Sequence, residues 1–509
     1  MQFTHTFFNK KNFNSPSDTG LKKSLRFWDL TGMGIAAIVG AGIFSTIGQA
    51  VVQGGPAVTL LFLFTAIACA LSALCYAAFA SSTSVSGSAY TYSFVSFGEL
   101  AAWMVGWNLI LEYAISNIAV AISWSAYFVS FAEGFGIKIT TTFDWFGNTL
   151  VINYPAFLIT VLVTIICYIG IEESKKANNF MVLLKIGTIL IIIGIGAFYV
   201  QPDNWHPFAP NGVQGVLYGV SSVFFAYIGF DAISTTAEEC RNPQKDMPRA
   251  MIASLAISTL LYLLITTILT GMVPYHTLGV ADPLAFVFET KQLHFISGFV
   301  SLISIITLSS VMLVYQLGQP RIWMSMSRDG LMPKKFSEVH PKFKTPSFST
   351  IIMGLMVGIP ALFADLKSVI DLTSIGTLFA FACVCLGVAL NKHTTNPKYS
   401  KFKIPYIKCR YYMLAMLLTL MAIVIFSFVT NDSFTIDYVK IFFYLISLIF
   451  AIYAIVKNLS LIPVLGVLMN IYLMTELGVH NWILFSIWIV LGFVIYALYA
   501  FRTKRLKFL

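Results

Sequence analysis

Charged residues are scarce in this chain. They make up 11% of its 509 residues, whereas hydrophobic residues make up 58%. An average soluble domain carries about 25% charged residues. So few charges cannot cover the surface of a water-soluble fold of this size. The composition therefore predicts an all-α integral membrane protein that crosses the bilayer many times.

The chain also lacks clusters of metal-ligating side chains. Its seven cysteines and seven histidines show no metal-ligand spacing, so we predict no disulfide framework, no metal site and no cofactor. The histidines lie in tails or loops and form no catalytic pattern, which argues against an enzyme. Residues 1–26 are polar and basic without a cleavable signal pattern, and we expect them to remain as a cytoplasmic tail.

Long apolar runs fill the rest of the chain. A transmembrane helix needs about 20 mainly apolar residues. Fourteen segments satisfy this requirement, and we number them in chain order: residues 27–51, 55–79, 99–131, 152–171, 178–200, 212–237, 250–273, 295–320, 347–365, 369–390, 411–430, 441–456, 459–475 and 481–501.

The distribution of Lys and Arg predicts the orientation. If the N-terminus is cytoplasmic, 27 of the 32 Lys and Arg fall in cytoplasmic tails and loops, four fall outside, and Lys185 lies within a span. This asymmetry predicts fourteen spans in a plasma (inner) membrane with both termini cytoplasmic. The net charge of +10 then reflects the orientation of the chain in the membrane. We therefore expect the protein to contact membrane lipid and not nucleic acid. No cysteine falls in an outside loop, and no obligate protein partner is evident.

Segments 1 and 6 each carry glycine near their middle. Segment 1 contains GMGIAAIVGAGIF (32–44), and segment 6 contains FFAYIGFDAISTTAEE (224–239) with Gly229 at mid-span. Each glycine costs a helix about 0.5–1 kcal/mol relative to alanine. Either another helix comes very close there, as the small-residue pairs Ala36/Gly40 and Ala37/Ala41 allow, or the helix breaks.

Paired interruptions favour a binding site. Broken helices at corresponding positions of two inverted halves are typical of transporters. Unwound backbone at membrane depth must line a cavity. Its N–H groups bind a carboxylate and its carbonyls bind an ammonium, and an α-amino acid carries both groups.

Six longer stretches carry a family resemblance: GIAAIVGAGIF (34–44), NLILEYAISN (108–117), NNFMVLLKIG (178–187), SSVFFAYIGFDAISTTAEECRNPQKDMPRAM (221–251), GQPRIWMSMSRDGLMP (318–333) and MNIYLMTELGVHNW (469–482). They resemble the amino acid–polyamine–organocation superfamily, and within it most closely the cationic amino acid transporter family.

The resemblance implies a leucine-transporter-type core of 5+5 inverted repeats with additional C-terminal helices. The implied division is a cytoplasmic tail (1–26), a first repeat (27–200), a second repeat (201–391), segments 11 to 14 (392–501) and a cytoplasmic C-tail (502–509).

The resemblance also implies the substrate site. The backbone of Gly40, Ala41 and Gly42 would bind the carboxylate. The ammonium would be shared among carbonyls beside the two breaks, with Gly229 at the second break; the carbonyls belong to Ile38, Phe225, Ala226 and Ile228. Phe225 is expected to be an aromatic lid over the substrate, and an ordinary packed aromatic is the alternative.

Three ionisable residues inside predicted spans are candidates for a functional role. A charged side chain such as that of Lys185 is energetically costly at this depth in the membrane. Lys185 is a candidate for proton coupling, because a lysine at this motif position in proton-coupled relatives takes the place of sodium. A structural tie to carbonyls of segment 1 is the alternative, and both roles are compatible. Glu112 is expected to contact the substrate side chain or a neighbouring polar group, or to join a proton path. Asp231 is expected to cap the second half of segment 6 as a gating or structural residue.

The side-chain pocket is predicted from segments 3, 6 and 8. Besides Asp231, its candidate lining residues are Ile115, Ser116, Met312 and Tyr315. Met312 is bulky and favours smaller, neutral substrates.

Together these features predict a secondary active permease for L-amino acids that works by proton-coupled symport and alternating access. An antiporter and a polyamine carrier remain alternatives, although a polyamine has no carboxylate for the amides of segment 1. A channel would not need paired broken helices. A membrane-embedded enzyme would need a catalytic cluster.

Overall fold

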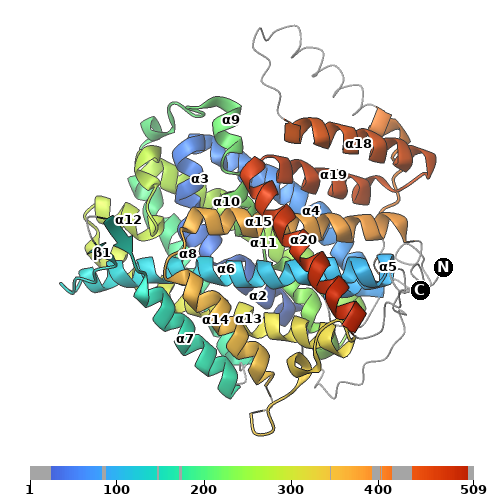
Figure 1. Cartoon of the computed structure of the whole chain (residues 1–509). Helices are drawn as coiled ribbons and strands as arrows, with labels where there is room; N and C mark the ends of the chain where they lie inside the picture. Colours follow the sequence, from blue (N-terminus) through green and yellow to red (C-terminus); the bar gives the residue numbers. More distant parts are fainter. Residues whose placement is uncertain are drawn as a thin grey trace.

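The computed structural model describes residues 25–82, 88–145, 148–170, 175–343, 345–391, 402, 404–414 and 438–502. Within these ranges the fold is helical, apart from one antiparallel hairpin in which β1 (Thr142–Trp145) pairs with β2 (Asn148–Val151). Figure 1 shows the helices packed into one bundle with the hairpin at its edge.

The first part of the chain forms α2 (Phe27–Ile38), the π-helix η1 (Gly42–Thr46), α3 (Ile47–Gly54), the 3₁₀ turn η2 (Gly55–Ala57), α4 (Val58–Ser82), α5 (Ser88–Phe97), α6 (Glu99–Glu133), α7 (Tyr154–Ile169), α8 (Lys175–Gly196) and the 3₁₀ turns η3 (Ala197–Tyr199) and η4 (Pro202–Trp205). The second part forms α9 (Gly212–Leu217), α10 (Val220–Tyr227), the 3₁₀ helix η5 (Phe230–Glu239), α11 (Pro243–Met272), η6 (Tyr275–Leu278), α12 (Pro283–Thr290), α13 (His294–Arg328), η7 (Lys334–Ser337), α14 (Ser347–Ala361) and α15 (Leu366–Leu390). The last described helices are α18 (Tyr438–Val456), α19 (Leu461–Thr475) and α20 (Val479–Arg502).

Among the described residues, seven helical stretches are long and apolar enough to cross a membrane. The first runs from Phe27 to Ser82 and holds predicted segments 1 and 2. Five shorter apolar helices coincide with segments 4, 6, 9, 12 and 13. Helices therefore lie in the predicted segments; of segment 11 the structure describes only residues 411–414, and these are helical. The prediction of a helical, multi-pass membrane protein is confirmed.

Segments 1 and 6 are broken where their glycines lie. In segment 1, α2 ends at Ile38, and the chain resumes as the π-helix η1. In segment 6, α10 ends at Tyr227, and Ile228 is extended. Gly229 has φ +126°, a conformation that L side chains rarely adopt, so glycine is required at this turn into η5.

Long helices surround the two broken segments. Two of the described helices, α6 and α13, have 35 residues each and pack along one another, and α6 crosses the centre of Figure 1. Helix α11 packs against α2 and α4, while α8 also contacts α2. The side chains of these helices meet in one continuous buried cluster that includes both broken segments.

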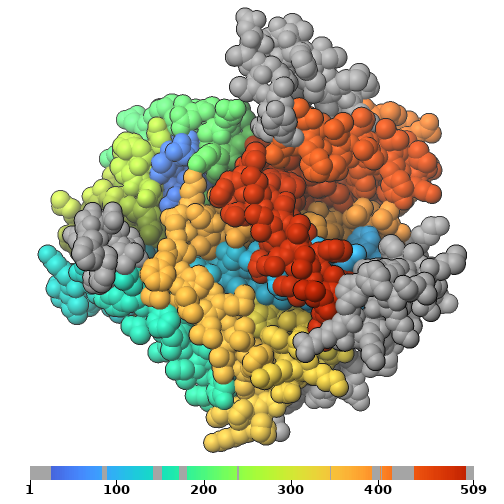
Figure 2. Space-filling view, viewed as in Figure 1, coloured from blue at the N-terminus to red at the C-terminus, as the bar shows by residue number. Residues whose placement is uncertain are grey.

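The C-terminal helix α20 lies across α6. Figure 2 shows it on the surface of the molecule. The Trp103 and Trp107 indole N–H groups of α6 donate to the carbonyls of Gly492, at 2.8 Å, and Trp488, at 3.0 Å. The Trp107 and Trp488 rings stack with centroids 4.5 Å apart. Backbone carbonyls of α20 thus accept hydrogen bonds from aromatic side chains of the bundle.

This contact depends on glycine at position 492. A Cβ atom on Gly492 would lie 2.3 Å from the ring of Trp107, whereas one on Gly298 in α13 meets nothing within 4 Å. We expect Gly492→Ala to destabilise the protein by about 1–3 kcal/mol, because overpacking displaces the indole. Gly298→Ala should be neutral or slightly stabilising. Thermal unfolding in detergent, followed by tryptophan fluorescence, measures both, and an equal Tm for the two variants would contradict the packing argument.

Candidate functional site

The two broken segments cross each other with their backbones in direct contact. A Cβ atom on Gly42 would lie 2.2 Å from the Cα atom of Ala226. One on Gly229 would lie 2.7 Å from the carbonyl carbon of Ala37. Such distances are shorter than any real Cβ contact, so both positions must be glycine for the segments to meet. The glycines therefore serve both alternatives left open by the sequence, since they break the helices and admit a close neighbour.

Backbone carbonyls gather at this crossing. The Tyr262 hydroxyl of α11 lies 2.9 Å from the carbonyl oxygen of Ile38 and 2.8 Å from that of Ala226. Tyr262 is fully buried. One phenolic proton can be donated to only one of these oxygens at a time, and each carbonyl keeps acceptor capacity. The structure thus brings together two of the predicted ammonium-binding carbonyls, one from each broken segment.

Sequence reasoning missed Tyr262. It is one of 23 tyrosines and lies in an apolar run without glycine or charge. A buried tyrosine needs a hydrogen-bond partner for its hydroxyl, but that need does not identify the partner. Only the tertiary crossing reveals that α11 supplies a donor to both breaks.

The remaining predicted backbone groups lie on either side of the crossing. Gly40 and Ala41 lie between α2 and η1, and Gly42 is the first residue of η1. The Gly40 carbonyl accepts from the amides of residues 43 and 44 at 3.2 Å. The Phe225 carbonyl accepts from the Ile228 amide at 3.3 Å. Phe225 itself is 5% exposed, so its ring is buried.

Lys185 binds the first broken segment. Its side chain is fully buried, and its Nζ donates to the carbonyl oxygen of Ala36 at 2.7 Å. Ala36 is two residues before the end of α2. The predicted structural contact between Lys185 and a carbonyl of segment 1 is therefore present. It joins α8 to the last turn of α2, just before the break.

Glu112 and Ser116 lie one turn apart on α6 and carry buried polar atoms. Both side chains are at most 2% exposed. Glu112 Oε2 and Ser116 Oγ have no hydrogen-bond partner among the described residues. Buried polar groups are nearly always paired, so atoms in this state are candidates for contact with a bound polar ligand.

The predicted side-chain pocket is buried between α6 and α13. Ile115 and Ser116 belong to α6, and Met312 and Tyr315 to α13; none is more than 8% exposed. The Tyr315 ring meets that of Tyr113 edge to face, with centroids 5.6 Å apart. The pocket residues therefore come from two helices that pack along each other beside the crossing.

Asp231 is buried in the first turn of η5, where it is the second helical residue and not the N-cap residue that the sequence predicts. The N-cap residue is Gly229, whose φ of +126° makes the tight turn before η5. There its carboxylate interacts favourably with the positive end of the helix dipole. Asp231 is also within electrostatic range of Glu112 and Tyr113.

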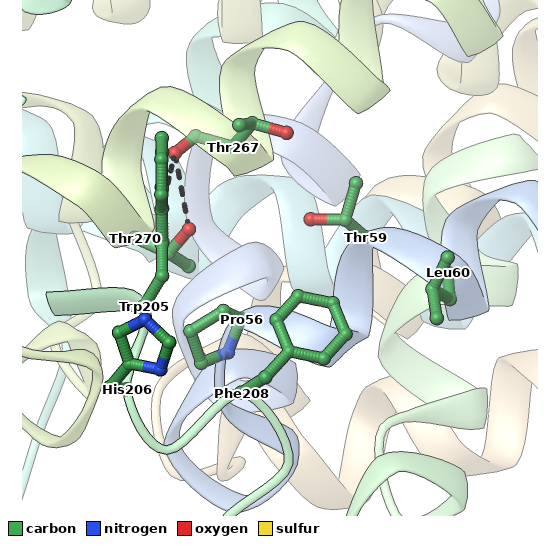
Figure 3. A pocket seen from close by; sticks show the side chains of 8 residues that line it. All are labelled: Pro56, Thr59, Leu60, Trp205, His206, Phe208, Thr267 and Thr270. Atoms are coloured by element: carbon green, nitrogen blue, oxygen red, sulfur yellow. Dashed lines mark hydrogen bonds between the residues drawn. The ribbon is translucent and has the colours of Figure 1, made fainter. Parts of the chain in front are cut away.

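A separate cavity of about 420 Å³ lies where α4 begins and α11 ends. Figure 3 shows its lining, in which the Trp205 indole donates to the Thr267 carbonyl at 3.3 Å. The lining is mainly apolar and is made by Pro56, Thr59, Leu60, Trp205, His206, Phe208, Thr267 and Thr270. No residue of the predicted site lines it.

Removing the Tyr262 hydroxyl tests the crossing. We expect Tyr262→Phe to destabilise the protein by about 1 kcal/mol, because carbonyls at both breaks lose their donor inside the bundle. Tyr154→Phe, which changes a tyrosine that is 37% exposed, is the matched control and should leave Tm unchanged. Thermal unfolding of purified protein measures the difference. If Tyr262→Phe unfolds at the wild-type temperature, the hydroxyl does not hold the two segments together.

Comparison with known proteins agrees with this arrangement. The chain matches a family model described as amino acid permease over residues 25–453, and a model of the C-terminus of that permease over residues 459–504. The two matches together cover most of the chain.

Individual relatives are similar over much of their length. The chain is 36% identical over 496 residues to the branched-chain amino acid permease BcaP of Bacillus subtilis (strain 168), with 96% of each chain covered. It is 42% identical over 391 residues to the methylthioribose transporter of the same organism, covering 76% of this chain and 85% of the relative. It is 32% identical over 507 residues to the chloroplastic cationic amino acid transporter 9 of Arabidopsis thaliana, covering 96% and 89%.

These relatives are transporters, and the family is one of permeases, which agrees with the expectation that the chain is not an enzyme. The family matches also confirm the resemblance carried by the sequence motifs. The chain is a multi-pass membrane protein that belongs to the amino acid permease family of the amino acid–polyamine–organocation superfamily.

Proposed function

We propose that this protein is a proton-coupled symporter of L-amino acids that works by alternating access in the plasma (inner) membrane. In this proposal segments 1–5 and 6–10 are inverted repeats, segments 11–14 are peripheral, and fourteen spans leave both termini in the cytoplasm. The observation that supports the proposal best is the crossing of the two broken segments at Gly42 and Gly229. Buried backbone carbonyls of both segments meet there inside the bundle.

The crossing suits a zwitterion. Gly40, Ala41 and Gly42 lie at the start of η1, which continues into α3, so a carboxylate there would meet backbone N–H groups and the positive end of a helix. The ammonium would bind the carbonyls of Ile38 and Ala226, which Tyr262 already brings together. The carbonyls of Phe225 and Ile228 would complete this side of the site, with the Phe225 ring as the lid.

Lys185 is the proposed proton carrier. A protonated ammonium donates to the Ala36 carbonyl and fixes α8 against segment 1. Deprotonation removes the positive charge and weakens that contact, so the two protonation states favour different positions of segment 1. Glu112, whose Oε2 lacks a partner among the described residues, is the second proposed group on the proton path.

The proposed side-chain pocket is limited in size. Met312 is fully buried in α13, and Ile115, Ser116 and Tyr315 are buried as well. This favours small or medium neutral side chains, which is compatible with a relative named for branched-chain amino acids. Because another relative is named a methylthioribose transporter, that thio-sugar is the second candidate substrate, although it lacks the carboxylate and ammonium that the crossing suits.

Transport in proteoliposomes tests the proposal. The panel contains neutral, branched-chain and cationic L-amino acids, a polyamine and methylthioribose, each measured with an inward proton gradient, an inward sodium gradient and neither. We expect a proton gradient to drive accumulation of an L-amino acid. Exchange that requires internal substrate would indicate an antiporter instead. Uptake of methylthioribose or polyamine alone would contradict the amino acid assignment.

The proton role of Lys185 has its own test. We expect Lys185→Ala to abolish accumulation driven by the proton gradient, because the charge that distinguishes the two states is gone. Lys138→Ala, which removes an exposed lysine, is the control and should accumulate substrate as the wild type does. Undiminished proton-driven accumulation by Lys185→Ala would remove Lys185 from the coupling mechanism.

Shortening Met312 tests the pocket. We expect Met312→Ala to raise the ratio of kcat/KM for large over small neutral amino acids by about tenfold, since it opens space where the side chain would lie. Met356→Ala in α14 removes the same atoms outside the proposed pocket and should leave the ratio unchanged. Equal ratios for all three proteins would place Met312 away from the substrate.

A further inference from the structure

The cavity between α4 and α11 is large enough to hold a ligand. It is bordered by the first turn of α4, the last turns of α11 and the connection between η4 and α9. Its volume of about 420 Å³ equals that of about 14 molecules in liquid water. Ligand cavities in proteins begin at about 300 Å³, so the chemistry of the lining decides what occupies this one.

The connection between η4 and α9 is fixed on both sides of the cavity. On the α11 side, the Asn204 side-chain amide donates to the Gly271 carbonyl at 2.8 Å. On the α4 side, the Ala57 amide donates to the Phe208 carbonyl at 2.9 Å. These bonds hold the connection across the cavity, so it does not fold inward to fill the space.

The lining offers water few hydrogen-bond partners. The Thr267 hydroxyl donates to the Leu263 carbonyl at 2.8 Å. The Thr270 hydroxyl donates to the Thr266 carbonyl at 2.9 Å, and the Trp205 indole is also bound to α11. Each buried water makes about three hydrogen bonds, so a cluster of water would be poorly bound in this space. An apolar occupant suits the lining better.

The cavity continues the lipid-facing surface of the bundle. On α4, Leu60 and Leu63 are one turn apart and are 58% and 45% exposed. On α11, Leu260 and Leu264 are 60% and 42% exposed, and Thr267 of the cavity lining follows on the same face. Helices α4 and α11 pack against each other, so two apolar stripes lead along them to the cavity. Hydrocarbon that covers these stripes in a membrane therefore reaches the cavity.

The cavity lies at the depth where acyl chains meet lipid headgroups. Thr267 is five residues, or about 8 Å, from the end of α11 at Met272. Thr59 lies in the first turn of α4. Trp205 borders the same space, and tryptophan is enriched at the membrane–water interface. An acyl chain that enters the cavity would therefore have its ester carbonyl close to the ends of both helices.

One hydroxyl of the lining is left to bind such a carbonyl. The Thr59 hydroxyl makes no hydrogen bond within the part of the chain that the structure describes. In Figure 3 it points into the space between the two helices. A threonine hydroxyl can donate to an ester carbonyl, while the hydrocarbon of the chain needs no polar partner.

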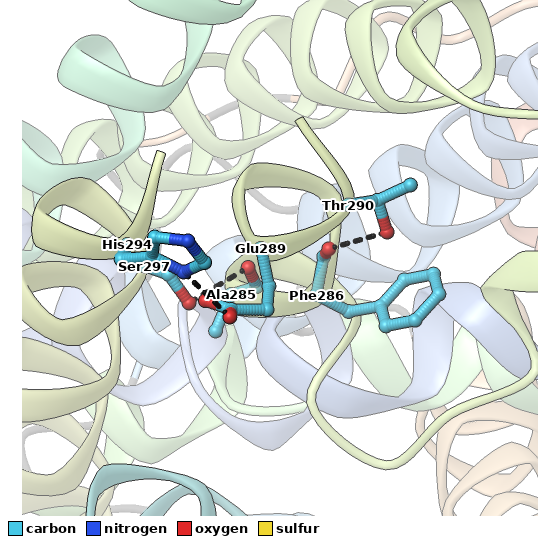
Figure 4. A network of polar contacts seen from close by, with 6 residues as sticks. All are labelled: Ala285, Phe286, Glu289, Thr290, His294 and Ser297. Atoms are coloured by element: carbon cyan, nitrogen blue, oxygen red, sulfur yellow. Dashed lines mark hydrogen bonds and ion pairs between the residues drawn. The ribbon is translucent and has the colours of Figure 1, made fainter. Parts of the chain in front are cut away.

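The connection that follows α11 uses its polar groups differently. Figure 4 shows the Ser297 hydroxyl of α13 donating to the Ala285 carbonyl of α12 at 3.1 Å. It also shows His294 Nδ1 at 2.7 Å from Glu289 Oε1. These polar groups bind one another, whereas the Thr59 hydroxyl faces an open space.

We propose that this cavity binds one acyl chain of a membrane phospholipid, with an ester carbonyl of the same lipid accepting a hydrogen bond from Thr59. The chain fills the space between the start of α4 and the end of α11. Because α11 carries Tyr262, five residues before Thr267, the bound lipid stabilises the helix that binds both broken segments. The inference does not depend on the proposed transport function.

Tryptophan quenching in the full-length protein tests the proposal. The protein is placed in nanodiscs of dioleoyl phosphatidylcholine with ordinary or dibrominated chains, because bromine quenches tryptophan fluorescence on contact. The chain has nine tryptophans, so the signal of Trp205 is the difference between each protein and the same protein with Trp205→Phe. We expect brominated lipid to quench Trp205 more strongly than acrylamide dissolved in the water does.

Two variants fill the cavity from opposite walls. Thr59→Phe and Thr267→Phe each place a ring where the acyl chain would lie. We expect each to lower the quenching of Trp205 by brominated lipid by about half, because the ring and the chain compete for one space. Leu63→Phe and Leu264→Phe add a ring to the exposed faces of the same helices outside the lining, and Trp205 should be quenched there as in the wild type.

A third variant removes only the hydroxyl. Thr59→Val keeps the shape of the side chain, and we expect it to lower the fraction of protein that retains a phospholipid in native mass spectrometry by about threefold. Thr290→Val changes an exposed threonine of α12 and should retain lipid as the wild type does. Equal retention by Thr59→Val and the wild type would overturn the proposed ester contact.

The quenching outcomes decide whether lipid occupies the cavity. Weaker quenching in the filling variants, but not in their controls, supports the proposal. Equal quenching in the filling variants and the wild type would place the lipid outside the cavity, and stronger quenching by acrylamide would show that water fills it; either result would overturn the proposal. If one filling variant fails to fold, the variant on the other helix and Thr59→Val still provide the test. None of these measurements uses transport, so failure of the proposed function leaves their meaning unchanged.

Discussion

The close crossing of two backbones organises this molecule. Gly42 and Gly229 let segments 1 and 6 approach each other without side chains between them. Each segment gives up helical hydrogen bonds at that point, and the cost is large where water is absent. The cost is offset because neighbouring helices bind the freed carbonyls.

The neighbours that bind the breaks come from different parts of the chain. Helix α11 contributes the Tyr262 hydroxyl to both segments, and α8 contributes Lys185 to the end of α2. Helix α6 contributes Tyr127 to the π-helix that follows the first break. Each contact joins a surrounding helix to a backbone carbonyl of segment 1 or 6. A change in any of these contacts therefore acts directly on the geometry of the proposed binding site.

The polar groups of the bundle fall into two classes with different physical roles. Tyr262 and Lys185 are paired with carbonyls and hold the fold. Glu112 Oε2 and Ser116 Oγ are buried without a partner among the described residues, which favours a role in binding. This distinction between paired and unpaired polar groups is compatible with the transport that we propose.

The sequence by itself determined the membrane class, the position of the helices and the two breaks, since these depend on local composition and on residues such as Gly229 that have few alternatives. It also identified the family, because the motif around segment 6 is long and specific. Sequence could not decide whether the glycines serve breakage or contact, and the structure shows both. It did not find Tyr262, and it placed the cap at Asp231 instead of Gly229. Those features depend on which helix lies beside which break, and that is decided by packing between residues far apart in the chain.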